Sequence, residues 1–254
     1  NSFLSFYKDN EQKANAWFDS FSSTLDLPVY TSVDIRDSGF KASSIDTNLF
    51  PAGFNNLCHV SIRNSVEKFN TAILSKVSDC KHILIICEEH TRNKWYLENI
   101  YTLDKIANDA GFTTTIATFM SESMVDEMSA DCLSLTTALD HQVSIRRLRP
   151  IIDAIKLGQS DIDLIILNND LTSGIPDELI ESELPIYPSP LLGWHRRKKT
   201  NHFYFFNQLT IDLFDHLGCL DTFDPWILST LYEEVDSIDI NLSEDRQKLY
   251  EVAK

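Results

Sequence analysis

Two uninterrupted apolar runs constrain the fold of this chain more than any other feature. His82 to Cys87 reads HILIIC, and Asp163 to Leu167 reads DLIIL. A strand with one face in water alternates apolar and polar residues, whereas a continuous apolar run is typical of a strand covered on both faces, as in a parallel sheet. The two runs therefore predict buried strands of a mostly parallel sheet.

Segments with helical periodicity lie between and around these runs. Apolar residues at three- and four-residue spacing predict helices at residues 11–21, 64–77, 93–110, 200–217 and 243–252. Residues 29–35 and 113–119 are rich in β-branched residues and predict further strands, and a small antiparallel excursion is expected at residues 134–137 and 142–145. Strands that alternate with helices indicate an α/β fold in which helices flank the sheet.

Composition changes near residue 220. Residues 221–254 contain nine acidic and three basic residues, a net charge of 3 − 9 = −6. We expect residues 1–220 to form an α/β substrate-binding domain and residues 221–254 to be an acidic connection toward a further, ATP-binding domain.

The stretch from Val33 to Leu57 is dense in polar side chains that a hydrophobic core does not need. Between them lie four apolar residues that we expect to anchor a long loop, namely Phe40, Leu49, Phe50 and Phe54. A long loop with its own anchors is usually functional or disordered, and the anchors argue against disorder. The alternative is an Ω-loop whose polar groups satisfy one another.

Charge and cysteine usage exclude several classes of protein. The net charge of −16 disfavours nucleic acid and anionic membranes as partners. No apolar run has the length of a membrane span, and no signal-peptide pattern begins the chain. Five cysteines without paired spacing argue against a disulfide framework. A reducing cytoplasm is the simplest location.

Polar turns follow three of the predicted strands, with the sequences DIRDSGFK, EEHTRN and NNDLTSG. Ligands bind open parallel sheets outside the carboxyl ends of the strands, so we expect the three turns to meet at one edge. Arginine and lysine there can hold carboxylates or phosphates, and acids can hold an ammonium group or a metal. This mixed charge suits a zwitterion such as an amino acid.

Other signals are weaker. No P-loop, GxGxxG, HExxH or GxSxG motif occurs. His90, beside Glu88 and Glu89, is a candidate general base or metal ligand, although a single histidine in a turn is more often only a hydrogen-bonding residue. The basic cluster from His195 to Lys199 is either a solvated helix entry or a local anion site.

Four motifs, in this order, resemble the proteobacterial glutamate–cysteine ligase family: VDIRDSGFKASSIDTNLFPAGFNNL, EEHTRNKWYLENI, LNNDLTSGIPDEL and GWHRRKKTNHF. The resemblance spans roughly residues 29 to 234 and implies a substrate domain that precedes an ATP-grasp-like half. The glycine-rich, lysine-containing segment of that half is expected beyond this sequence, which has only 7 glycines. The chain therefore resembles the N-terminal part of the enzyme.

The resemblance implies an ATP-dependent reaction with Mg²⁺, in which the γ-carboxylate of L-glutamate becomes an acyl phosphate and the amine of L-cysteine attacks it. Under this hypothesis Arg36, Lys41 and Arg92 contact the substrate carboxylate or acyl phosphate. Asp34, Glu89 and Asp170 would hold the ammonium group, and Asp46 and His90 are further substrate-binding candidates. The amides would fix the orientation of the substrates, namely Asn48, Asn55, Asn56, Asn168 and Asn169. Nucleotide phosphates are assigned to Arg196, Arg197 and Lys198, and the metal ligands are left unassigned.

Two alternatives remain open from the sequence. The first is that the chain is a non-catalytic amino-acid-binding module derived from that enzyme. The second is that it is an unrelated α/β transferase.

Overall fold

The computed structural model of the chain describes residues 2–89, 92–119, 132–235 and 238–253. By their contacts these residues divide into two compact units, each of which is discontinuous in sequence. Unit 1 comprises residues 1–26, 33–47 and 198–254, and unit 2 comprises residues 27–32 and 48–197. This division does not follow the boundary expected at residue 220, and the acidic connection at residues 221–254 stays a prediction.

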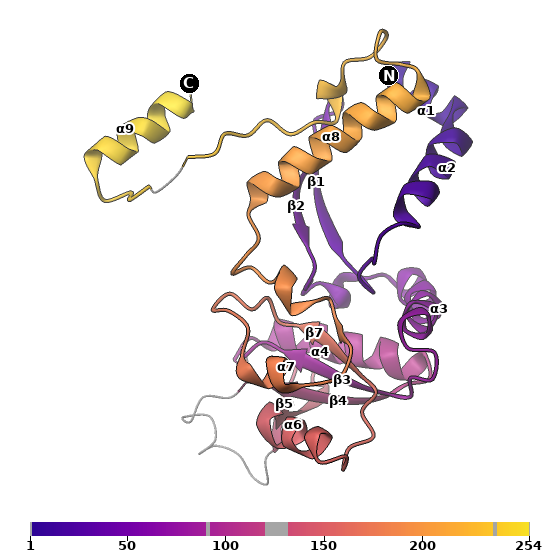
Figure 1. Cartoon of the computed structure of the whole chain (residues 1–254), viewed down its shortest axis with the longest axis vertical. Helices are drawn as coiled ribbons and strands as arrows, with labels where there is room; N and C mark the ends of the chain where they lie inside the picture. The colour runs from indigo at the N-terminus through magenta and orange to yellow at the C-terminus, as the bar shows by residue number, and fades with distance from the viewer. Residues whose placement is uncertain (1, 90–91, 120–131, 236–237, 254) are drawn as a thin grey trace. The chain divides into compact units, whose positions relative to one another are not determined.

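A six-stranded sheet with the order β5-β6-β4-β3-β7-β8 forms the centre of unit 2 (Figure 1). Its strands are β3 (His82–Cys87), β4 (Thr113–Thr118), β5 (Cys132–Thr136), β6 (Gln142–Arg147), β7 (Leu164–Asn168) and β8 (Ile186–Tyr187). All neighbours run parallel except β5, which is antiparallel to β6. The mostly parallel sheet and the antiparallel excursion are therefore confirmed.

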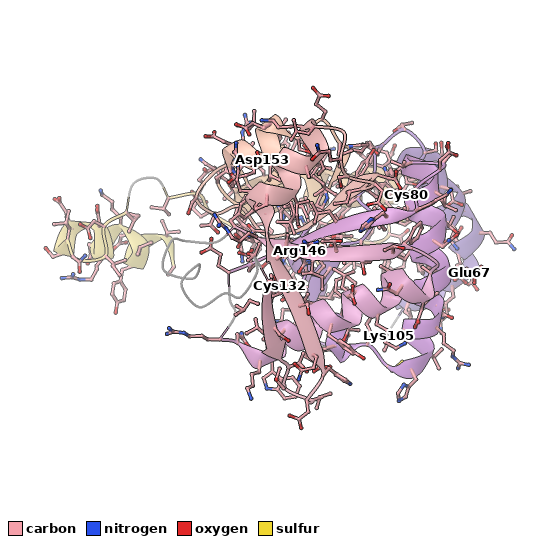
Figure 2. All side chains as sticks on the ribbon, turned by 90° about the horizontal axis from the view of Figure 1, so that it is seen from below. Glu67, Cys80, Lys105, Cys132, Arg146 and Asp153 are labelled. Carbon is pink, nitrogen blue, oxygen red and sulfur yellow. The ribbon has the colours of Figure 1, made fainter. Side chains whose placement is uncertain are left out.

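Helices cover both faces of this sheet, as the continuous apolar runs predict. The helices of unit 2 are α3 (His59–Lys76), α4 (Lys94–Asp109), α6 (Leu148–Lys156) and α7 (Asp177–Glu181), with the short 3₁₀ helices η1 (Phe54–Asn56) and η2 (Pro190–Leu192). Figure 2 shows Asp153 of α6 and Lys105 of α4 on opposite sides of the strand that carries Arg146.

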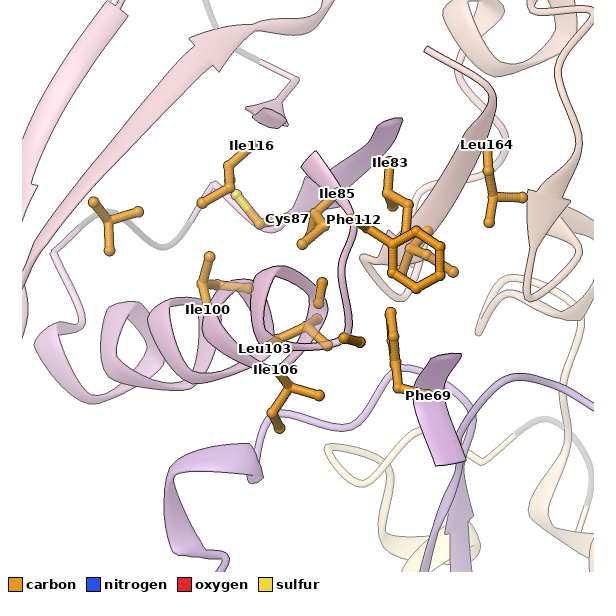
Figure 3. Packing of buried hydrophobic residues seen from close by; sticks show 14 of the residues in the cluster. Phe69, Ile83, Ile85, Cys87, Ile100, Leu103, Ile106, Phe112, Ile116 and Leu164 are labelled. Atoms are coloured by element: carbon orange, nitrogen blue, oxygen red, sulfur yellow. The ribbon is translucent and has the colours of Figure 1, made fainter. Parts of the chain in front are cut away.

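Alternate residues of β3 enter two separate cores. Ile83 and Ile85 pack in one core with α3 and α4, where Phe69, Ile100, Leu103 and Ile106 surround them (Figure 3). Leu84 and Ile86 pack in the other core, which α6 and α7 cover. Both faces of β3 are thus removed from water, and from Ile83 to Cys87 the strand is fully buried.

Unit 1 contains α1 (Ser2–Asp9), α2 (Glu11–Ser22), β1 (Ser32–Asp37), β2 (Ala42–Asn48), α8 (Lys199–Leu217), the 3₁₀ helix η3 (Pro225–Ile227) and α9 (Ser243–Val252). Its core is formed by α1, α2 and α8, with Ala14 and Phe214 fully buried. The helix α8 ends at Gly218, whose φ of 72° is a left-handed conformation that glycine adopts without strain. The predicted helices at residues 11–21, 200–217 and 243–252 are confirmed.

The stretch from Val33 to Leu57 is not one long loop. Most of its first half forms β1 and β2, which pair as a separate two-stranded sheet, so the expectation that the first polar turn follows a strand of the parallel sheet is wrong. The sequence pattern of this segment led to the wrong expectation because β1 is a strand that is exposed along nearly its whole length. Phe40, expected as a buried anchor, is 66% exposed, whereas Phe50 is buried in unit 2 as expected.

We expect Ile85→Ala to lower the free energy of unfolding by about 2–5 kcal/mol, because it leaves a cavity at the centre of the sheet. Ile85 is fully buried. Urea unfolding followed by far-UV circular dichroism measures the change. The control is Ile180→Ala, since Ile180 on α7 is 68% exposed, and an equal loss in both variants would contradict the assignment of Ile85 to the core.

A buried carboxylate ties the β5–β6 hairpin to α4. Glu98 of α4 is 3% exposed, and its carboxylate accepts from His141 Nδ1 at 2.8 Å and from the Leu139 N–H at 3.2 Å. Burial raises the pKa of Glu98, but hydrogen bonds from Thr137, His141 and Leu139 outweigh burial and hold that pKa below its ordinary value.

A lowered pKa in the folded state means that ionised Glu98 stabilises the fold above the pKa it has in the unfolded chain, and that this stability is lost as pH falls through the folded pKa. We expect the stability difference between the wild type and Glu98→Gln to be large at pH 5–7 and to shrink below about pH 4. Urea unfolding at a series of pH values tests this, and a difference independent of pH would contradict it.

Candidate functional site

The carboxyl ends of the central strands of unit 2 carry a pocket of about 390 Å³. The segments that follow β3, β4 and β7 supply its lining. The lining residues are Glu88, Glu89, Phe119, Asn169, Asp170, Leu171, Thr172, Ser173, Gly174 and Pro176. This is the edge at which parallel α/β sheets bind ligands, because the buried strands end there and the connecting segments are free to carry polar groups.

Three residues with carboxylate side chains line the pocket, and a hydrogen bond joins two of these residues. Glu88 Oε1 accepts a hydrogen bond from the Asp170 N–H at 2.6 Å, which joins the segment after β3 to the segment after β7. Asp170 Oδ1 accepts from the N–H and the hydroxyl of Thr172, at 3.0 and 2.5 Å. This turn fixes the Asp170 side chain and leaves Oδ2 without a hydrogen bond among the described residues.

Asn168 is the last residue of β7, and Asn169 follows it. Both side chains lie inside the protein, with exposed fractions of 1% and 7%. The Asn169 side chain donates to the Cys87 carbonyl at 3.3 Å and accepts from the Leu171 N–H at 3.0 Å. Leu171 itself has φ of 53°, a conformation uncommon outside glycine, and this positive φ marks the turn that lines the pocket. Asn169 thus positions the backbone on both sides of the pocket.

A buried polar network lies beneath the pocket, centred on Asn168. Its Nδ2 donates to the Pro51 carbonyl at 2.9 Å, and its Oδ1 accepts from the Asn99 amide at 3.4 Å. Tyr96 donates from its hydroxyl to the Asn168 carbonyl at 3.1 Å and accepts from the Glu88 N–H at 2.7 Å. Burial raises the pKa of Tyr96, so its hydroxyl keeps the proton that it donates.

The segment from Asn48 to Asn56 is attached to this network through main-chain groups. The Phe54 N–H donates to Asn99 Oδ1 at 3.0 Å, and Asn48 Oδ1 accepts from the Phe50 N–H at 2.8 Å. The Asn55 Oδ1 atom is buried and has no hydrogen bond within the described part of the chain, while Asn56 is exposed. Asn48 therefore has a local structural role, and none of the three amides lines the pocket.

Tyr30 is a second buried polar group near Asn168. Burial raises its pKa, and the nearby Asn168 side chain offsets this only in part. The Tyr30 hydroxyl has no hydrogen bond of normal geometry among the described residues, and its ring packs edge-on against Phe54 at 5.0 Å between centroids. Tyr30 thus adds an uncompensated polar group to an otherwise well-connected network.

The pocket brings together only some of the predicted site residues. Glu89, Asn169 and Asp170 line it, and Asn168 supports it from below. Arg92 is exposed before α4 and is not part of the lining. His90 lies outside the described residues. Among the described residues the lining contains three carboxylates and no arginine or lysine, so this part of the pocket is acidic and the mixed-sign pocket stays a prediction.

Four predicted residues lie in unit 1, on or near the β1–β2 sheet. Asp34 and Arg36 are exposed on β1, and Asp46 of β2 forms an ion pair with Lys199 at 3.0 Å. Lys41 Nζ donates to the Trp226 and Ser229 carbonyls and lies 4.2 Å from the centre of the Trp226 ring. These contacts give Lys41 a structural role within unit 1.

The basic cluster is engaged in part. The Arg197 guanidinium lies 5.5 Å from the Trp194 ring centre, and Lys198 pairs with Glu234 at 2.9 Å. Arg196 is exposed. No glycine-rich phosphate cradle accompanies these residues, and the described residues contain no group of three or more His, Cys, Asp or Glu side chains with the arrangement of a metal site.

Sequence reasoning left several residues of the site unassigned. Glu88, Thr172 and Ser173 belong to the polar turns EEHTRN and NNDLTSG. Their position directly after buried strands could have identified them as residues of the site. Tyr96 and Asn99 had no such signal, because they lie on the face of α4 that the periodicity assigns to the core.

A family model described as glutamate-cysteine ligase matches residues 5–254, nearly the whole chain. The chain belongs to the glutamate-cysteine ligase family. A solved structure from Methylobacillus flagellatus KT, described provisionally as a gamma-glutamylcysteine synthetase, matches with a TM-score of 0.82 at 29% identity. That match covers 98% of this chain and 57% of the other, so this member of the glutamate-cysteine ligase family spans little more than half the length of its structural relative.

Two further findings are negative. No curated protein sequence matches the chain. None of its described helices combines the length and the apolar character needed to cross a membrane.

We expect Asn168→Ala to lower the free energy of unfolding by about 1–3 kcal/mol, because it leaves the Pro51 carbonyl and the Asn99 amide buried without a partner. Urea unfolding measures the loss. Asn56→Ala is the matched control, since Asn56 is exposed, and equal stability of the two variants would contradict the supporting role of Asn168.

Proposed function

We propose that this chain takes part in the ATP-dependent ligation of the L-glutamate γ-carboxylate to the amine of L-cysteine, and that the pocket after β3 and β7 binds the ammonium group of an amino-acid substrate. Membership of the glutamate-cysteine ligase family supports the reaction class. The acidic pocket supports the binding role, and it is the observation that carries the proposal.

The chemistry of the lining favours a cation. Glu88, Glu89 and Asp170 place three carboxylates around one pocket, and the Asp170 side chain is fixed by its own turn. An ammonium group has three N–H donors, and carboxylate, amide and hydroxyl oxygens can accept hydrogen bonds from them. A fixed set of acceptors costs little reorganisation when the substrate binds, so positioning of the amine is the contribution that these residues make.

The carboxylates of the substrates need cationic partners that this pocket does not contain. We propose Arg36 and Arg92 for that role, because both guanidinium groups are exposed and a guanidinium binds a carboxylate through two parallel hydrogen bonds. Asp34 and His90 keep their proposed substrate roles, whereas Lys41, Asp46 and Asn48 are better explained by their contacts within the fold.

ATP supplies the phosphoryl group that activates the γ-carboxylate, and Mg²⁺ neutralises charge during that transfer. Arg196, Arg197 and Lys198 stay the proposed phosphate contacts within this chain, and the Mg²⁺ ligands stay unassigned. The cytoplasm is the proposed location of the reaction.

The family match is inconsistent with an unrelated transferase. A non-catalytic amino-acid-binding module remains the second candidate. Both candidates require the ammonium site, so the experiment addresses that site directly.

Thermal unfolding is measured with L-glutamate, L-cysteine and their N-acetyl derivatives, which lack the ammonium group. We expect the free amino acid that binds to stabilise the chain by about 2.7 kcal/mol at 100 times its Kd, and its N-acetyl derivative to have no effect. Asp170→Asn should weaken binding about tenfold or more, because it removes the charge that faces the amine.

The matched control is Glu67→Gln on the exposed face of α3, which should bind as the wild type does. Stabilisation by the N-acetyl derivatives equal to that by the free amino acids would overturn the ammonium site. Absence of binding by both amino acids would overturn the proposed function as a whole.

A further inference from the structure

A second pocket in unit 2, of about 300 Å³, lies on the α6 face of the sheet. Its walls come from α6, from the start of β3, from β4 and from the segment at residues 159–162. His82, at the amino end of β3, lines one end of this pocket, and Arg146, which pairs with Ala117 at the level of Ile86, lines it near the carboxyl ends of the strands. The pocket shares no lining residue with the pocket of the proposed function.

The strand pairing explains why a cavity exists here. β6 pairs with β4 only at Ala117–Arg146 and Thr118–Arg147, so the first half of β4 forms no strand pairing with β6. Thr115 stands in this unpaired part of β4 and lines the pocket. The sheet therefore opens between β4 and β6, and Arg146 lies at the point where the opening begins.

Arginine side chains give the pocket a positive wall in a protein whose net charge is −16. Arg146 and Arg147 both line it. The Arg146 side chain forms no hydrogen bond or ion pair with the described residues, while nearby Arg149 pairs with Asp153 at 3.2 Å and with Glu181 at 3.0 Å. Within the described part of the chain, no acid offsets the charge of the Arg146 guanidinium.

The remaining polar groups are held in place. His82 Nδ1 lies 3.0 Å from Asp161 Oδ1, and Nε2 lies 2.9 Å from Thr115 Oγ1, so the imidazole is fixed on both sides. Asp161 is the single acid among the described lining residues, and its carboxylate lies against the His82 imidazole.

We propose that this pocket binds a small oxyanion with two negative charges, of the phosphate type, with Arg146 as its principal ligand. A guanidinium holds such an anion through two parallel hydrogen bonds, and the pocket has the size of a small-ligand site. The site is distinct from the acidic pocket after β3 and β7, and it does not depend on the proposed function.

Binding of inorganic phosphate to the full chain is measured by isothermal titration calorimetry at constant ionic strength, with chloride replacing phosphate in the reference. We expect saturable binding that Arg146→Ala weakens by about tenfold or more, as loss of a charge-assisted pair predicts. Arg149→Ala is the matched control, because it removes an arginine already paired with acids, and it should change the affinity by less than about twofold.

The location is checked by amide chemical shifts of ¹⁵N-labelled protein during the same titration. Phosphate should shift the amides of residues 159–162 and leave those of Glu89 and Asp170 unchanged. Circular dichroism confirms that Arg146→Ala is folded. Absence of saturable binding, equal affinity of the two variants, or shifts confined to residues 88–89 and 169–174 would each overturn the proposal.

Discussion

Burial of both faces of β3 and β7 is the constraint on which unit 2 depends. Residues 83–87 and 164–168 are almost entirely removed from water, and their neighbours on α3, α4 and α6 exist to cover them. A strand of this kind tolerates no charge along its length. The charged groups that a ligand-binding protein needs must therefore collect where the strands end, which is where Glu88 and Asp170 meet.

Asn168 marks the change from core to site. It is the last residue of β7 and is 1% exposed, yet it connects the Pro51 carbonyl, Asn99 and Tyr96 through hydrogen bonds. A buried network with most groups satisfied is rigid, and its rigidity passes to the turn that holds Asp170. The same sheet carries a second pocket, where the short β4–β6 pairing ends and where Arg146 and His82 are among the lining residues. One sheet thus carries an acidic pocket and an arginine-lined pocket that share no residue.

Much of unit 2 was predictable because its signals are local. The runs HILIIC and DLIIL predicted strands within a residue of their observed bounds, and the turns after them predicted Glu89, Asn169 and Asp170 at one edge. The expectation that the turn with Arg36 and Lys41 follows a strand of the parallel sheet was wrong, since a β-branched segment has the same sequence pattern in a buried sheet and in an exposed hairpin. Only the pairing partner distinguishes the two, and that partner, β2, lies within the stretch interpreted as a loop.

The sequence by itself determined the α/β class, the buried strands, the polar strand ends and the resemblance to glutamate-cysteine ligases, because each depends on residues that are close in the chain. The tertiary structure decided which polar groups share a pocket. Glu88 and Asp170 are 82 positions apart, and the β1 residues belong to a different sheet. Such pairings follow from strand order and register, which long-range packing selects and which no local pattern encodes.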